Sequence, residues 1–286
     1  MKIDQLNFKK LTLNELGILV DWARDEGWNP GPHDAEVFYT ADPDGHYGYF
    51  LEDEMIAGGS IVSYGGVFGF MGLFIVKPEY RSLGIGRSLW YQRRDLLLSR
   101  LVSGASVGMD GVVAMQPFYR KGGFETAFRD ERHMNIGHAF PSDPHISAIE
   151  ASDFDSILTF DSQCFGFQRP QFLKPWLNLP GNSCFKYVKD GQLMGFAIMR
   201  KAHSGYKICP LFANDGFVAE ALYQACLNAA RGEKVFLDIP VTNPAAIELI
   251  KRHDTTYVFE CARMYYGKVP EVNLHKIFGI TTFELG

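Results

Sequence analysis

Residues 74–89, Phe-Ile-Val-Lys-Pro-Glu-Tyr-Arg-Ser-Leu-Gly-Ile-Gly-Arg-Ser-Leu, combine an apolar strand, a loop with two glycines and the start of a helix. The first turn of a helix presents unpaired N–H groups and the positive end of the helix dipole. Glycine lacks the Cβ atom that would keep a phosphate away from this backbone. Arg81 and Arg87 add cationic donors at the edges of the loop. The segment therefore predicts a binding site for a pyrophosphate group.

Two common phosphate-binding loops do not fit this segment. A P-loop needs Lys and then Ser or Thr after its last glycine, but Arg87 follows Gly86. The dinucleotide fingerprint needs a third glycine three residues after Gly86, and that position is Leu89. The pattern that is present, Arg-x-x-Gly-x-Gly at 81–86 after a strand ending in Val-x-Pro, resembles the acetyl-CoA motif of the GNAT superfamily of N-acetyltransferases.

The resemblance implies acetyl-CoA as the co-substrate and no metal. In the GNAT family, backbone N–H groups of this loop hold the CoA pyrophosphate, and the edge of the preceding strand pairs with the pantetheine arm. The cofactor-binding residues that the resemblance implies are Phe74, Ile75, Val76, Arg81, Ser82, Leu83, Gly84, Ile85, Gly86 and Arg87.

A second match lies after the next expected strand. Tyr119-Arg-Lys-Gly-Gly-Phe124 resembles the family's Tyr-x-x-x-Gly-Phe segment. The resemblance gives Tyr119 the role of general acid, which protonates the CoA thiolate as it leaves. One position departs from the family pattern, because Val112 stands where the family often has Asn. Asp110 and Gln116 are the candidates to make that cofactor contact instead.

The loop at residues 26–31, Glu-Gly-Trp-Asn-Pro-Gly, occupies the place that lines the acceptor side in the family. An amine acceptor is usually cationic and must lose a proton before it attacks a thioester, so a carboxylate or an ordered water is needed nearby. We expect Glu26 or Asp34 to be the catalytic base or the anchor of the acceptor. Trp28 and Asn29 are the expected substrate-binding residues, since an aromatic face suits a cation. The alternative is a solvated helix end with Trp28 in the core.

The periodicity of apolar residues predicts a mixed order of helices and strands. In the first half, helices are expected at 13–24, 34–39, 85–101 and 114–121, and strands at 48–52, 55–63, 68–76, 106–109 and 127–136. In the second half, helices are expected at 153–164, 217–230 and 244–252, and strands at 185–188, 193–201, 206–211, 235–240 and 257–266.

The two halves therefore repeat one order of elements, although not one sequence. Residues 137–145 contain Pro141-Ser-Asp-Pro144 and are the expected linker. We predict an α+β (mixed α/β) fold of two tandem GNAT-like domains, residues 1–139 and 146–286. Each domain would be a mixed, largely antiparallel sheet flanked by helices. The string at 26–31 and several segments of the second half also look like a GNAT subgroup with a divergent C-terminal domain.

The second half lacks the features that carry the chemistry of the first. Its segment 212–216, Phe-Ala-Asn-Asp-Gly, has neither the arginine nor the paired glycines, and Ile250 stands at the counterpart of Tyr119. We predict that this half has no catalytic site of its own. It would complete the acceptor cleft or stabilise the first domain.

Composition narrows the class of protein. The 286 residues carry a net charge of −5, which does not indicate a nucleic-acid binder. No signal core or run of about 20 apolar residues is present, so we expect no membrane segment and a cytoplasmic location. The five cysteines show no CxxC pair, which predicts buried thiols rather than a zinc site.

Three functions fit these patterns. The first is transfer of an acetyl group from acetyl-CoA to a primary amine of a small molecule. The second is a non-catalytic CoA-binding sensor or regulator, and the third is a protein lysine or N-terminal acetyltransferase. The complete loop and Tyr119 favour an enzyme over a sensor. A roof over the cleft would favour a small acceptor over a protein chain.

Overall fold

The computed structural model describes residues 3–286. In the first half, the strands are β1 (Asn7–Lys10), β2 (His46–Leu51), β3 (Glu54–Tyr64), β4 (Phe68–Val76), β5 (Ser106–Val112) and β6 (Phe124–Ile136). The helices of this half are α1 (Leu13–Asp25), α2 (Asp34–Ala41), α3 (Ile85–Ser99) and α4 (Gln116–Lys121).

In the second half, the strands are β7 (Ile146–Ala148), β8 (Ser183–Lys189), β9 (Gln192–Lys201), β10 (Tyr206–Ala213), β11 (Lys234–Pro240), β12 (Thr256–Tyr266) and β13 (Ile277–Gly279). The helices are α5 (Phe154–Phe165), α6 (Pro170–Leu177), α7 (Gly216–Ala229) and α8 (Pro244–Arg252). The expected repeat is confirmed, since β2-β3-β4-α3-β5-α4-β6 is matched by β8-β9-β10-α7-β11-α8-β12.

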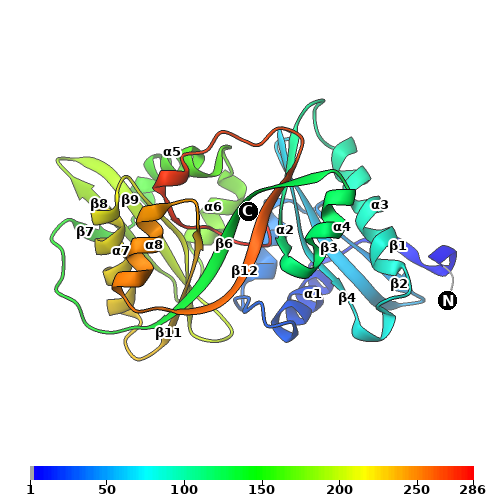
Figure 1. Cartoon of the computed structure of the whole chain (residues 1–286), viewed down its shortest axis with the longest axis horizontal. Helices are drawn as coiled ribbons and strands as arrows, with labels where there is room; N and C mark the ends of the chain where they lie inside the picture. Colours follow the sequence, from blue (N-terminus) through cyan, green and yellow to red (C-terminus); the bar gives the residue numbers. More distant parts are fainter. Residues whose placement is uncertain (1–2) are drawn as a thin grey trace.

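The two halves share one sheet, which the sequence did not indicate. The strand order is β1-β2-β3-β4-β5-β12-β6-β11-β10-β9-β8-β7. Strand β12 of the second half therefore lies between β5 and β6 of the first, and β6 pairs with β11. Figure 1 shows these long strands crossing the middle of the molecule. The division at residues 139 and 146 stays a prediction about domains, because strands from both sides of it are interleaved.

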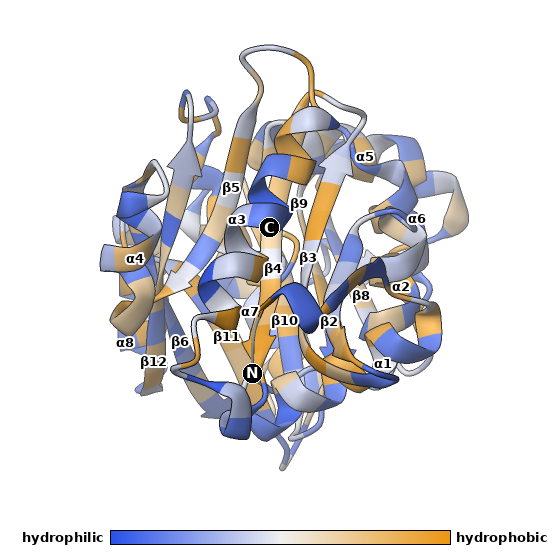
Figure 2. Cartoon of the chain, turned by 90° about the vertical axis from the view of Figure 1, so that its right-hand side faces the viewer, coloured by the Kyte–Doolittle hydropathy of each residue, from blue (hydrophilic) through white to orange (hydrophobic). Residues whose placement is uncertain are grey.

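Helices from both halves pack into one apolar core. Leu16, Leu19 and Ala23 of α1 are fully buried, and the core continues through α2 to Phe172 and Trp176 of α6. The rings of Phe38 and Trp176 stack with centroids 6.3 Å apart, which joins α2 to α6. Figure 2 shows the apolar residues running along β3 and β4 beneath the surrounding helices. This shared core supports the mixed architecture that was expected.

Strand β4 separates from β5 part-way along its length. The parallel pairing joins Phe68–Met71 to Ser106–Met109 and goes no further. The register between β3 and β4 then shifts, and Leu73 adopts a positive φ of 47°. A bulge of this kind bends a strand away from its neighbour. The edge of β4 that faces β5 therefore has no strand partner beyond Met71 among the described residues.

The segment after β13 returns from the second half to the first. Residues Thr281, Thr282, Glu284 and Leu285 are all buried. The Tyr64 hydroxyl donates to the Leu285 carbonyl at 2.8 Å. Figure 1 places the C-terminal end between the two halves. We call residues 280–286 the return segment.

A buried ion pair fastens the return segment. Arg169 donates to both oxygens of Asp161 at 2.8 Å, and also to the Gly286 carbonyl and the Thr281 hydroxyl. Both side chains of the pair are 0% exposed. We expect Arg169→Met to lower the free energy of unfolding by about 3 kcal/mol, because it leaves Asp161 buried without its partner.

Denaturant unfolding measures this loss. The matched control is Lys268→Met, which breaks the pair with Glu271 at side chains that are 78% and 87% exposed. Exposed pairs contribute less than about 1 kcal/mol, so the control should unfold like the parent protein. Equal losses in the two variants would contradict the assignment of Arg169 as an anchor.

Candidate functional site

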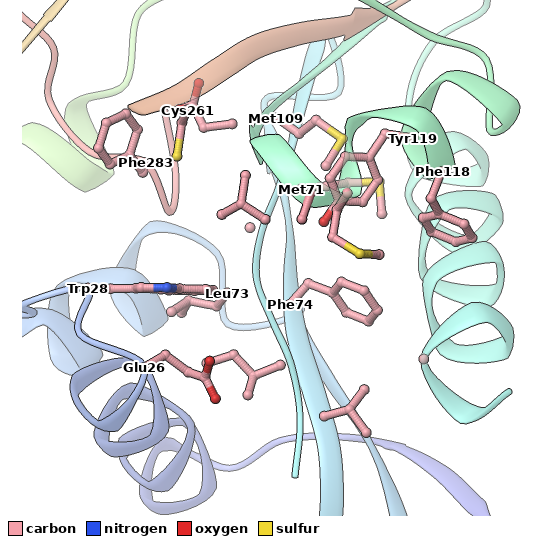
Figure 3. Close-up of a pocket in the computed structure, with 18 of the residues that line it drawn as sticks. Glu26, Trp28, Met71, Leu73, Phe74, Met109, Phe118, Tyr119, Cys261 and Phe283 are labelled. Atoms are coloured by element: carbon pink, nitrogen blue, oxygen red, sulfur yellow. The ribbon is translucent and has the colours of Figure 1, made fainter. Parts of the chain in front are cut away.

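A cavity of about 690 Å³ opens beside the free edge of β4. Its walls come from β4, β5, β12, the loop before α3, α4 and the return segment. The residues that line it include Glu26, Trp28, Met71, Gly72, Leu73, Met109, Asp110, Val112, Met115, Phe118, Tyr119, Phe259, Cys261, Phe283 and Glu284. Figure 3 shows Trp28 and Phe283 on one side of this space and Tyr119 and Phe74 on the other. The volume is that of a typical small-molecule site.

The loop before α3 presents unpaired backbone donors to this cavity. No hydrogen bond is found for the N–H groups of residues 82–87 in the described part of the chain. Gly84 caps α3 with a φ of 80° and provides no side-chain acceptor for those groups. Ser82 also has a positive φ, of 64°. The loop is thus shaped to leave its donors free, as an anion-binding helix start requires.

Gly86 brings α3 close to β4. A Cβ atom at this position would lie 3.1 Å from Val76 Cγ2 and 3.3 Å from Phe74 Cζ. Glycine therefore keeps the helix start and the strand edge at the distance that the cavity needs.

Most of the expected cofactor residues line the cavity. Those that do are Phe74, Ile75, Val76, Arg81, Ser82, Gly84, Gly86 and Arg87. Leu83 and Ile85 do not: the Leu83 side chain is 53% exposed, and that of Ile85 is 2% exposed in a core beneath the helix. Their backbone N–H groups, rather than their side chains, remain candidate donors.

Arg81 is engaged by the protein itself. Its Nε donates to the Val76 carbonyl at 2.9 Å, and its Nη2 donates to Glu26. Glu26 lines the cavity, as expected for the acceptor side, but its carboxylate already has this cationic partner. The pair joins the end of α1 to the end of β4 at the cavity wall.

Tyr119 points its hydroxyl toward the cavity from α4. Its side chain is 5% exposed, and its ring stacks on Trp90 with centroids 5.8 Å apart. The hydroxyl has no hydrogen-bond partner within residues 3–286. Burial raises the pKa of Tyr119 above its usual range, although the nearby Arg93 guanidinium opposes this. The hydroxyl therefore keeps its proton at neutral pH, and no hydrogen-bond acceptor in the described residues engages that proton.

Two of the expected acceptor-side residues have structural roles instead. Asp34 is 1% exposed and does not line the cavity. It pairs with the equally buried Arg200 at 2.9 Å and accepts the Gly31 N–H at 2.8 Å. Asn29 accepts from the Ser204 N–H at 2.7 Å and donates to the Ser204 carbonyl at 3.0 Å. Both side chains tie the loop at 26–31 to the second half, which corrects their assignment to the acceptor site.

Trp28, the other expected substrate-binding residue, contacts both the cavity and the second half. It lines the cavity, and its carbonyl accepts from Arg132 Nη1 at 3.0 Å and from Lys207 Nζ at 3.1 Å. Of the two candidates to replace the family's Asn, Asp110 lines the cavity and Gln116 does not. Asp110 is held by Arg263 at 2.7 and 2.9 Å.

Several lining residues were missed by the sequence analysis. Phe259 and Cys261 reach the cavity because β12 is inserted beside β5, and Phe283 and Glu284 reach it on the return segment. These positions come from long-range pairing, so no local sequence signal could have placed them. Met71, Met109 and Met115 were placed on expected elements but not recognised as lining residues.

The corresponding site of the second half is closed by the protein. Asp215 caps α7 and accepts from the N–H groups of Phe217 and Val218 at 2.9 and 3.0 Å. Strand β13 pairs with β10 at Leu211 and Phe212, on the edge opposite β9. Strand β13 therefore fills the gap between β10 and β11, whereas the corresponding gap between β4 and β5 has no such strand among the described residues. The absence of a catalytic site in the second half stays a prediction.

Residues 3–286 contain no group of three or more His, Cys, Asp or Glu side chains placed to hold a metal ion. No helix in that range has the length and apolar character that crossing a membrane requires.

Comparisons with known proteins agree with this geometry. A model of the acetyltransferase (GNAT) family matches residues 14–124, and a model of an acetyltransferase (GNAT) domain matches residues 157–279. Holothin acyltransferase of Pseudoalteromonas sp. (strain SANK 73390) is 30% identical over 280 residues, which cover 97% of this chain and 94% of the relative. The chain belongs to the GNAT acetyltransferase superfamily.

Two solved structures share the fold of the whole chain. A Pyrococcus horikoshii protein, solved as a candidate acetyltransferase, matches 100% of this chain and 98% of its own with a TM-score of 0.84 at 23% identity. A tandem GNAT protein from the clavulanic acid biosynthesis pathway matches 93% of this chain and 99% of its own with a TM-score of 0.63 at 12% identity. At these identities the solved structures support only the tandem fold. The similarity to Holothin acyltransferase supports acyl transfer as the class of reaction.

Proposed function

We propose that this GNAT acyltransferase moves an acetyl group from acetyl-CoA to a primary amine of a small molecule. One observation carries the proposal. A single cavity brings together the unpaired N–H groups of residues 82–87, the free edge of β4 and the hydroxyl of Tyr119. These are the parts that hold a diphosphate, align an extended amide-bearing arm and protonate a leaving thiolate.

The residues present fit CoA. The N–H groups at the start of α3 suit the pyrophosphate because they are unpaired and lie at the positive end of the helix dipole. The free edge of β4 suits the pantetheine amides, since an extended chain can add to an open strand edge. Bound acetyl-CoA supplies the activated acyl group as a thioester. Arg87 adds positive charge beside the loop. Arg81 can add more if its side chain exchanges Glu26 for the pyrophosphate.

Tyr119 is the proposed general acid. Its hydroxyl keeps its proton at neutral pH, faces the cavity and has no competing partner in residues 3–286. Proton donation to the sulfur as the C–S bond breaks avoids the release of a free thiolate into an apolar cavity. Glu26 is proposed to hold Arg81 at the cavity wall, and Trp28 to offer an aromatic face to the acceptor.

A small acceptor is favoured because the second half contributes to the walls of the cavity. Phe259, Cys261, Phe283 and Glu284 come from the second half and line the same cavity as Trp28, the proposed acceptor-side residue. A protein substrate needs an open groove for its chain on both sides of the modified residue. The name of the Pseudoalteromonas relative, an acyltransferase for holothin, supports acyl transfer as the reaction.

Release of free thiol from acetyl-CoA tests the proposal. We expect turnover with some members of a panel of aliphatic, aromatic and heteroaromatic primary amines, and much less with lysine-containing peptides. Propionyl- and butyryl-CoA should be run beside acetyl-CoA, since the donor class is part of the proposal. Tight CoA binding without turnover on any amine or peptide would support a sensor instead. Turnover confined to peptides would contradict the small-molecule assignment.

A further inference from the structure

Glu284 lies on the return segment beside strand β4. A side chain at Gly72 would put its Cβ atom 1.8 Å from the Glu284 carbonyl oxygen, so the return segment is packed directly on β4. The contact is one residue before Leu73, where β4 leaves β5. Glu284 also lines the cavity that contains Tyr119. The sequence analysis gave this residue no role.

The Glu284 carboxylate is buried, and it makes no hydrogen bond or ion pair within the described residues. Glu284 is 4% exposed as a whole residue. Its Oε2 atom is fully buried and makes no hydrogen bond within the described residues. No hydrogen bond or ion pair to Oε1 is found within residues 3–286 either. A buried carboxylate without a partner is costly unless something else supplies a donor. This cost points to a ligand that brings a hydrogen-bond donor or a positive charge.

The other carboxylates that line the cavity are already engaged. Asp110 accepts two hydrogen bonds from Arg263, and Glu26 accepts one from Arg81. Both therefore have cationic partners supplied by the protein. Among the carboxylates that line the cavity in the described chain, Glu284 is the one whose oxygens remain available to bind a substrate amine.

The charges that face Glu284 are largely paired among themselves. Arg132 is held by Asp238 at 2.6 Å, and Arg200 by Asp34 at 2.9 Å. Asp110 is within electrostatic range of Glu284 but is paired with Arg263. Lys207 donates to the Trp28 carbonyl at 3.1 Å, and burial lowers its pKa to about 8. Lys207 is therefore the protein cation that could compete with a substrate amine for Glu284.

Hydrogen bonds fix the backbone of the return segment around Glu284. The N–H groups of Glu284 and Leu285 donate to the Thr282 hydroxyl at 3.1 and 2.8 Å. Tyr64 and Arg169 bind the next two carbonyls, those of Leu285 and Gly286. A carboxylate fixed by its own backbone in this way is positioned before any substrate arrives.

We propose that Glu284 binds the acceptor amine and receives its proton during acyl transfer. The inference rests on the proposed function. The amine nitrogen forms the C–N bond with the thioester carbonyl carbon, and the C–S bond breaks. An acceptor that arrives as an ammonium ion first loses one proton to solvent by way of Glu284. After the neutral amine attacks, the second proton lost by nitrogen goes to Glu284, while the Tyr119 hydroxyl gives its proton to sulfur. Release of a proton from Glu284 and uptake of one by Tyr119 restore the enzyme, so the reaction is balanced without another reactant.

Glu284→Gln tests the inference, with acetyl-CoA and the best amine of the panel as substrates. The amide keeps the size of the side chain but cannot accept the proton, so we expect kcat to fall by about 100-fold or more. The KM for acetyl-CoA should stay unchanged. Glu284→Asp keeps a carboxylate and should recover about a tenth of the lost activity. A role in packing alone predicts the opposite order, because Gln fits the site better than Asp.

A double variant separates catalysis from charge balance. If Glu284 only neutralises Lys207, then Glu284→Gln combined with Lys207→Met should recover the activity that Glu284→Gln loses. We expect the double variant to stay as inactive as Glu284→Gln. Recovery would overturn the inference.

The remaining outcomes distinguish this inference from the proposed function. A parent protein that turns over no amine removes the proposed function, and the inference with it. An active parent together with an equally active Glu284→Gln overturns the inference alone. Glu26→Gln tests the rival carboxylate: a loss of kcat in that variant with none in Glu284→Gln would assign the proton to Glu26 and overturn the inference.

Discussion

Tyr119→Phe lowers kcat by about 100- to 1,000-fold and leaves the dissociation constant for CoA unchanged. Removal of a general acid costs this order of rate, because the thiolate must then leave without its proton. The fold should not suffer, since the hydroxyl makes no hydrogen bond in the described residues and the ring keeps its stacking on Trp90. The measurements are steady-state turnover with acetyl-CoA and calorimetric titration with CoA.

Tyr91→Phe is the matched control for this prediction. Tyr91 packs against the same Trp90 ring with centroids 5.0 Å apart, but it does not line the cavity. It loses the same atom and should keep the parent's kcat. An equal loss in both variants would point to the aromatic cluster rather than to acid catalysis. Unchanged turnover in Tyr119→Phe would remove Tyr119 from the mechanism.

The donor side of the site could be predicted from the sequence because its signals are local. Glycines at 84 and 86, an apolar strand before them and a helix after them occupy one short segment. Backbone conformation within such a segment depends on its own residues, so the positive φ of Gly84 follows from the residue type. Tyr119 was found in the same way, from a short motif at the end of a helix.

The acceptor side could not be predicted because it is assembled from distant parts of the chain. Asp34 and Asn29 looked free in the sequence, but their partners, Arg200 and Ser204, come from the second half. The insertion of β12 beside β5 brings Cys261 to the cavity through strand pairing. Such pairing is decided by the packing of the whole sheet. The burial of the return segment, and with it the position of Glu284, depends on the same packing.

The two halves show how one fold can carry an open or a closed anion site. The sequence analysis recognised that the second half lacks the paired glycines. The structure adds that Asp215 satisfies the N–H groups of α7 and that β13 fills the neighbouring strand gap. An internal carboxylate at the helix start thus takes the place that an external phosphate would have.

Gly84→Asp should convert the open site into the closed form. Gly84 and Asp215 are the N-cap residues of α3 and α7. The new carboxylate can accept from the first free N–H groups of α3, and it would repel the pyrophosphate. Loss of about two charge-assisted hydrogen bonds costs roughly 3 kcal/mol, so we expect CoA affinity to fall by about 100-fold. Calorimetric titration with CoA measures this change.

Gly84→Ala separates the effect of charge from that of backbone strain. Both substitutions place a Cβ atom at a φ of 80°, which costs about 1 kcal/mol. Only Asp offsets that cost, because a helix cap stabilises by about 1 kcal/mol. Gly84→Asp should therefore resist denaturant better than Gly84→Ala and yet bind CoA more weakly. This opposite order of stability and affinity is expected if the pyrophosphate binds at the free N–H groups of the helix start, so parallel changes in the two variants would contradict the assignment of the loop.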